Sequence, residues 1–171
     1  MEMSRAKFWV YQHAGIIVLL LVLVTGVGLY FVGGSGGTFA IPTVGAVLSL
    51  AYFLQKQKLD EIRLFKELFV DFNKRYKDLN DELTPLKDPS AEAQLTDKEK
   101  QTLVDYFNLC AEEYLFHRRG YIHPDAWTAW SNGMQDILKS KRIRAFWKTE
   151  KDTFSYYGFE RQIRAWFPDA A

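Results

Sequence analysis

GLYFVGGSGGTFAIP, residues 28–42, places five small residues, GGSGG at 33–37, between two long hydrophobic segments. No charged residue occurs from position 14 to position 55, whereas the rest of the 171-residue chain is rich in Lys, Arg, Asp and Glu. This change of composition predicts two parts: an N-terminal apolar unit, residues 1–55, and a polar unit, residues 56–171.

Both hydrophobic segments are long enough to cross a membrane as helices. Residues 14–32 would extend about 28 Å and residues 38–54 about 26 Å, against roughly 30 Å for a hydrocarbon core. Aromatic residues lie near the segment ends, as in the interfacial belts of membrane proteins: Phe8, Trp9, Tyr11, Tyr30, Phe31, Phe39, Tyr52 and Phe53. The pattern favours a transmembrane helical hairpin, and the alternative is a cleaved signal peptide followed by a single anchor.

Basic residues flank this hairpin and are missing from its tip. Arg5 and Lys7 precede the first segment, and Lys56, Lys58 and Arg63 follow the second. Because membrane proteins keep such residues inside the cell, we expect a multi-pass membrane protein with both termini in the cytoplasm and almost nothing on the far side.

Small residues within the segments suggest close helix packing in the membrane. Gly26 and Gly28 lie in the first segment, and Gly45 and Ser49 are four residues apart in the second. Small residues at this spacing let two helices approach closely. Packing within the hairpin and self-association of several copies both fit. Neither segment contains Asp, Glu, Lys or Arg, which argues against a proton relay or a voltage sensor.

The polar unit is predicted to be all-α, a cytoplasmic bundle of four or five helices. Residues 57–83 carry a seam of apolar residues at alternating spacings of three and four: Ile62, Phe65, Phe69, Phe72, Tyr76, Leu79 and Leu83. Because the seam is wide and rich in aromatic residues, it favours packing within one domain over the alternative, a coiled-coil dimer.

Local signals divide the remainder into further helices. Residues 84–95 predict a loop containing two prolines. Thr96 and Glu99 form a capping-box pattern before a helix that ends near Gly120. Other signals indicate a helix after His123-Pro124, a short one capped by Ser140, and a last segment over 154–167.

The chain lacks recognisable catalytic motifs, including a P-loop, GxSxG and HExxH. We therefore expect no enzymatic activity, catalytic residue, cofactor, bound metal or small-molecule substrate. The nearest cluster, Glu112, Glu113, His117 and His123, fits a surface ion pair and a helix-start histidine better than a metal site. Cys110, the single cysteine, is expected to be a buried, inert thiol.

Charge is distributed unevenly along the polar unit. Residues 56–116 contain 10 basic and 14 acidic side chains, whereas residues 117–171 contain 10 basic and 6 acidic ones. Nucleic acid, anionic lipid and the chain's own acidic half are three candidate targets for the basic half. The candidate contacts to an anionic partner are Arg118, Arg119, Lys141, Arg142, Arg144 and Lys148.

The layout resembles the two-transmembrane effectors of bacterial retron anti-phage systems. The resemblance is carried by the hairpin with its glycine-rich tip, by LDEIRLFKELFVDFNKRYKDLN (59–80) and YFNLCAEEYLFHRRGYIHPDAWTAWSNGM (106–134), and by RIRAFW (142–147) and SYYGF (155–159). It implies an inner-membrane protein held silent by a reverse transcriptase with its RNA–DNA product. On infection the protein would be released to permeabilise the membrane, causing abortive infection. The alternative is a membrane-anchored helical adaptor that recruits a cytoplasmic partner and forms no pore.

Overall fold

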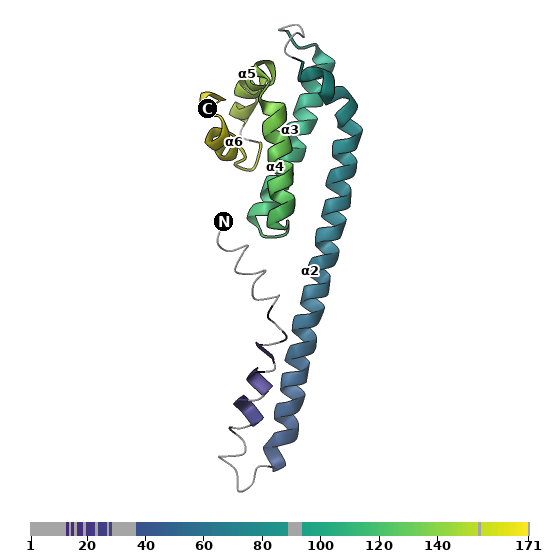
Figure 1. The fold of residues 1–171 in the computed structure, drawn as a ribbon, viewed down its shortest axis with the longest axis vertical. Coiled ribbons are helices and arrows are strands. Elements are labelled where there is room, and N and C mark those ends of the chain that lie inside the picture. Colours follow the sequence, from purple (N-terminus) through teal and green to yellow (C-terminus); the bar gives the residue numbers. More distant parts are fainter. Residues whose placement is uncertain are drawn as a thin grey trace. The chain divides into compact units, whose positions relative to one another are not determined.

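The computed structural model describes residues 13, 15, 17–18, 20–22, 24–26, 28, 37–88, 94–153 and 155–170. Five α-helices and two short 3-10 helices follow one another in this part of the chain (Figure 1): α2 (Gly37–Leu86), α3 (Asp97–Arg118), α4 (Pro124–Leu138), α5 (Lys141–Glu150), η1 (Lys151–Thr153), α6 (Glu160–Trp166) and η2 (Pro168–Ala170). No strand occurs among the described residues, and the all-α prediction is confirmed. The chain forms two compact units, Met1–Leu64 and Phe65–Ala171.

The first unit contains the two hydrophobic segments. Most of residues 14–32, and the predicted tip at 33–36, lie outside the described residues. The described positions from 13 to 28 are helical, and α2 covers the second segment. Among the described residues, no helix combines the length with the apolar composition that a membrane crossing requires, and no transmembrane hairpin is found there.

The long helix α2 ends later than the sequence predicts. The loop expected to begin at residue 84 begins only after Leu86, and Pro85 lies in the last turn of the helix. Proline removes one backbone donor, but Leu86 in the same turn is only 1% exposed. Burying a leucine side chain stabilises by about 1.5–3 kcal/mol, which offsets much of the roughly 3 kcal/mol that a proline costs within a helix.

In the second unit, α3 runs back alongside the C-terminal part of α2, and α4 returns beside α3 (Figure 1). From Phe65 onward the α2 seam faces these helices: Phe72 and Leu83 are buried, and the Phe69 ring stacks on Trp130 with centroids 5.6 Å apart. The seam therefore packs within its own domain, as predicted. Ile62, in the first unit, is exposed.

The predicted ends of α3 and the predicted start of α4 are confirmed. The Thr96 hydroxyl accepts from the Glu99 backbone N–H, and the Glu99 carboxylate accepts from the Thr96 N–H, at 3.2 and 2.7 Å. After α3, Gly120 takes a φ of 77°, the left-handed conformation in which glycine ends helices at low cost. His123 precedes Pro124 and accepts from the Asp125 N–H at its Nδ1 atom.

Two predictions about the C-terminal region are wrong in detail. Ser140 precedes α5, but its hydroxyl donates to the Leu86 carbonyl and makes no capping bond. The predicted segment 154–167 is helical only from Glu160 onward. Tyr157 and Gly158 both have positive φ, 53° and 87°, and this left-handed pair prevents a helix from starting earlier.

The main core of the second unit lies where α5 and α6 cover α3 and α4. Trp147 is 1% exposed and packs edge-on against Phe107 with ring centroids 4.9 Å apart. Tyr156 and Phe159 contact the same indole. The aromatic residues that the sequence places in separate helices thus form one continuous core.

Candidate functional site

The predicted small-residue positions lie in open space within the described structure. A Cβ atom added at Gly26, Gly28 or Gly45 would meet no described heavy atom within 4 Å. Ser49 and Gly45 are both exposed. No packing contact among the described residues depends on these positions.

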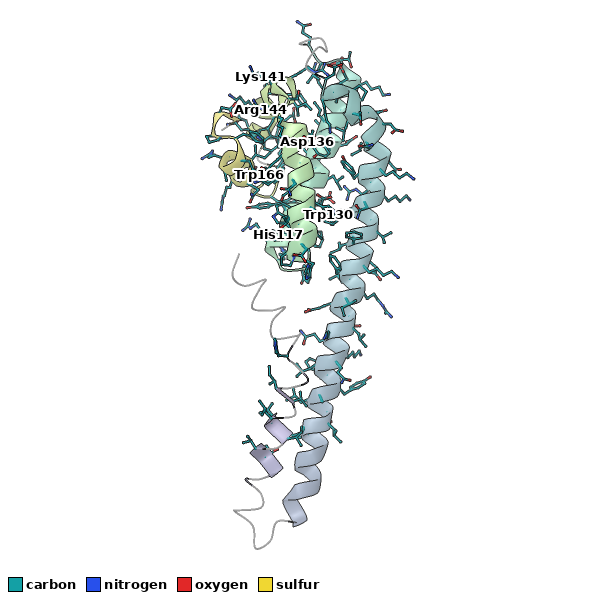
Figure 2. All side chains as sticks on the ribbon, in the orientation of Figure 1. His117, Trp130, Asp136, Lys141, Arg144 and Trp166 are labelled. Atoms are coloured by element: carbon teal, nitrogen blue, oxygen red, sulfur yellow. The ribbon has the colours of Figure 1, made fainter. Side chains whose placement is uncertain are left out.

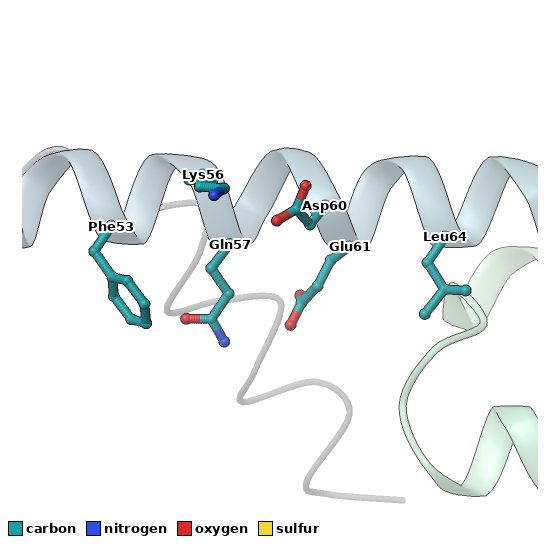
Figure 3. Close-up of a pocket in the computed structure, with 6 residues that line it drawn as sticks. All are labelled: Phe53, Lys56, Gln57, Asp60, Glu61 and Leu64. Atoms are coloured by element: carbon teal, nitrogen blue, oxygen red, sulfur yellow. The ribbon is translucent and has the colours of Figure 1, made fainter.

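A pocket of about 390 Å³ lies along one side of α2 at the end of the second hydrophobic segment. Its lining changes from apolar to charged along the helix: Phe53, Lys56, Gln57, Asp60, Glu61 and Leu64. Phe53, Gln57 and Glu61 point to the same side of the helix in Figure 3. This composition is that of an amphipathic helix face.

Three of the six candidate cations are held by the bundle itself. Arg144 donates to the Leu138 and Lys139 carbonyls at 2.7 and 2.9 Å, and so satisfies the end of α4. Arg142 is largely buried, with an amino group 3.6 Å from the Glu99 carboxylate. Arg118 lies over the Tyr114 ring and donates to the Tyr157 carbonyl. These arginines stabilise helix ends and turns.

The other three cations, Arg119, Lys141 and Lys148, are exposed and make no ion pair with another described residue. They do not form one surface. Arg119 follows α3, whereas Lys141 and Lys148 belong to α5, and the 15-residue helix α4 between them is about 22 Å long. Figure 2 shows His117, near Arg119, and Lys141 at opposite ends of the bundle.

The four acidic and histidine residues considered as a metal site have separate roles. Glu112 forms a two-point ion pair with Arg75, at 2.6 and 3.2 Å, which joins α3 to α2. His117 stacks on Trp127, with centroids 4.5 Å apart and rings nearly parallel; its burial lowers the pKa of the imidazole. His123 begins α4. No group of metal-binding side chains occurs among the described residues.

Glu113 is the member of this group for which the predicted surface position is wrong. Its side chain faces inward between α2, α3 and α4, and it is only 6% exposed. Burial raises the pKa of this carboxyl group from 4.5 to about 8. Charges at Arg75 and Glu112 act in opposite directions and only modify this effect. A surface ion pair with His117 is therefore not its role.

Glu113 borders a partly open cavity of about 160 Å³ in the second unit. The lining residues come from three helices: Asn73 and Tyr76 on α2, Tyr106, Leu109, Cys110 and Glu113 on α3, and Ala129, Trp130, Gly133 and Met134 on α4. Cys110 is buried, as predicted, and burial strongly raises the pKa of its thiol. The sequence signal for this site was a glutamate in register with apolar Tyr106 and Cys110 on the buried face of α3.

Comparisons of the chain with protein-family models, with curated proteins and with solved structures find no match.

Proposed function

We propose that this chain is a toxic membrane effector of a bacterial antiviral defence system of the retron type. Residues 14–32 and 38–54 form a hairpin in the inner membrane, with both termini in the cytoplasm. Release from a partner lets several copies associate through this hairpin and permeabilise or depolarise the membrane. The membrane hairpin rests on the sequence pattern, and the defence role rests on the resemblance.

The observation that carries the proposal is the continuity of α2. One 50-residue helix, Gly37–Leu86, contains the second hydrophobic segment and also the seam that packs in the bundle. Large apolar side chains are exposed in its N-terminal part, including Leu48 at 64% and Phe53 at 61%. In the proposed mechanism these side chains contact lipid, and α2 links them to the domain that receives the signal.

The second support is the open surface at the small residues. Since Gly45 and Gly26 have no described neighbour where a Cβ would lie, they are available for contact with another copy. Glycine and serine faces promote such contact in lipid by allowing close backbone approach.

The proposed partner is a reverse transcriptase with its RNA–DNA product. The exposed cations Lys141 and Lys148 are seven residues apart on α5, which places them two turns apart on one helix face. Such a pair suits contact with phosphate groups. Partner release is measured by loss of co-purification after phage infection.

Membrane potential in bacteria expressing the chain without its partner tests the mechanism. We expect collapse of the potential with the wild-type chain, and preservation with Gly45→Leu or Gly26→Leu, because a bulky residue separates the helices. Val47→Leu is the matched control, since position 47 lies on another face of α2. Equal collapse with Gly45→Leu and Val47→Leu at equal protein levels would exclude close packing at Gly45.

The competing function is a membrane-anchored adaptor without pore activity. Replacing residues 1–55 by an unrelated two-span anchor distinguishes the two. Loss of toxicity after the replacement supports the effector, and full retention supports the adaptor.

A further inference from the structure

We propose that the cavity between α2, α3 and α4 is a binding site for a small organic ammonium ion, with the Glu113 carboxylate as its counter-ion. This inference goes beyond the proposed membrane function and does not depend on it. It concerns only residues of the second unit.

The buried carboxyl group is the first reason. Glu113 is 94% removed from solvent and lines the cavity. Among the described residues, no hydrogen bond or ion pair reaches its carboxyl oxygens. Buried carboxylates are normally paired or hydrogen-bonded, because an unpaired one is costly to desolvate. A group left without a protein partner and facing a cavity is suited to a partner that enters the cavity.

The chemistry of the lining is the second reason, because it favours a cation. Among the described residues, no Lys, Arg or His lines the cavity, and Glu113 is the only carboxyl group in its lining. Three aromatic side chains, Tyr76, Tyr106 and Trp130, contribute to the wall. Aromatic faces attract cations through their electron density. A carboxylate combined with aromatic side chains is a common surrounding of a bound ammonium group.

Asn73, Tyr76, Tyr106 and Cys110 supply the other polar groups of the wall. The Asn73 amide nitrogen donates to the Phe69 carbonyl at 2.6 Å, which leaves the amide oxygen as the part that can accept a bond from a ligand. The Tyr106 hydroxyl interacts with the Cys110 thiol. The wall therefore offers acceptors to a ligand that donates several hydrogen bonds, as a primary ammonium does.

Size limits the ligand further. A cavity of about 160 Å³ is close to that of an engineered protein cavity that holds benzene, roughly 150 Å³. The ligand is thus a monoamine with one compact apolar group. Leu109, Ala129 and Met134 supply the apolar part of the wall.

Proton release accompanies binding. Because burial raises the Glu113 pKa to about 8, the empty site holds a neutral carboxyl group for most molecules at neutral pH. An entering ammonium ion favours the carboxylate, so one carboxyl proton passes to the buffer. Arg75 and Tyr76 on α2, and Tyr106, Cys110 and Glu112 on α3, are the other titratable groups near Glu113; the α4 side of the cavity has none.

The experiment is calorimetric titration of the full chain in detergent micelles with cyclohexylammonium chloride. Cyclohexanol is the neutral analogue of the same shape, and potassium chloride is the salt control. We expect saturable binding of the amine, at least tenfold weaker binding of the alcohol, and proton release at pH 7 that disappears above pH 9. A change in tryptophan fluorescence on binding that is lost in Trp130→Phe reports that the amine occupies this cavity.

Two variants locate the binding. Glu113→Gln keeps the shape and removes the charge, and we expect at least a tenfold loss of amine affinity. Glu112→Gln is the matched control, because Glu112 pairs with Arg75 and does not line the cavity. Gly133→Leu adds a side chain to the α4 wall of the cavity, where a Cβ meets no described atom within 4 Å, and we expect it to weaken amine binding at least tenfold.

The proposal is overturned by equal affinity for amine and alcohol, by unchanged amine binding in both Glu113→Gln and Gly133→Leu, or by no saturable binding of the amine to the wild-type chain. None of these results bears on membrane depolarisation, so failure here leaves the proposed function intact.

Discussion

Hydrophobic residues of the first and second units behave differently, although α2 belongs to both. In the first unit, Leu48 and Phe53 are largely exposed, whereas Phe72 and Leu83 in the second are at most 2% exposed. The first group lies in a run without charged residues, and the second is a seam between charged side chains. A helix with an apolar seam buries only the face that carries the seam. A helix that is apolar all round needs an apolar surrounding on every side, and we propose that lipid supplies it.

The largest predicted difference between the two units is the loss of stability caused by truncating an apolar side chain. Trp147→Ala should reduce the free energy of unfolding of the second unit by about 3–5 kcal/mol, because it leaves a large cavity in the core. Leu48→Ala, in the first unit, should change that free energy by less than about 0.5 kcal/mol. Urea unfolding of the full chain in micelles, followed by circular dichroism, measures both. Similar losses in the two variants would contradict the division.

The pH dependence of stability tests the buried carboxyl group. The folded-state pKa of Glu113, about 8, lies above its ordinary value of 4.5, so the folded state retains a proton that the unfolded state loses. The wild type therefore loses stability relative to Glu113→Gln as pH rises from about 4.5 to 8. With about 1.4 kcal/mol for each pKa unit, the difference reaches about 5 kcal/mol above pH 8.

Unfolding of both proteins between pH 4 and pH 9 measures this difference. Glu112→Gln is the control: it keeps Glu113, so it should lose stability with rising pH as the wild type does. A constant difference between wild type and Glu113→Gln across the range would mean that the carboxyl group is hydrated in the folded protein.

The smallest expected effect concerns the start of α3. Thr96→Ala removes a capping bond and should destabilise the second unit by about 1 kcal/mol. Thr149→Ala is the control, since the Thr149 hydroxyl bonds only within its own helix, to the Phe146 carbonyl. Equal effects of the two substitutions on the unfolding free energy would show that the capping box does not stabilise the domain.

Local signals in the sequence predicted much of the fold. The capping box at Thr96, the glycine after α3 and the proline at the start of α4 act within a few residues, so their outcome does not depend on distant parts of the chain. Ser140 was misjudged because its hydroxyl bonds a carbonyl 54 residues away. A contact of that kind leaves no periodic trace in the sequence.

The candidate site was less predictable for the same reason. Arg144 looks like a surface cation in the sequence, and only the fold shows that it satisfies the end of α4. Glu113 follows Glu112 directly, yet one pairs with Arg75 while the other faces a cavity built by three helices. Adjacent residues on a helix point in directions about 100° apart, and the neighbours on each side are set by tertiary packing.

Cysteine labelling in intact cells tests most directly whether the first unit crosses the membrane. Wild-type Cys110 is buried with a raised pKa, so it should not react and serves as the background. We predict that a membrane-impermeant maleimide modifies Ser35→Cys in intact cells, and modifies Lys148→Cys only after the membrane is opened. Modification of both variants to the same extent in intact cells, or of neither until the membrane is opened, would contradict the account.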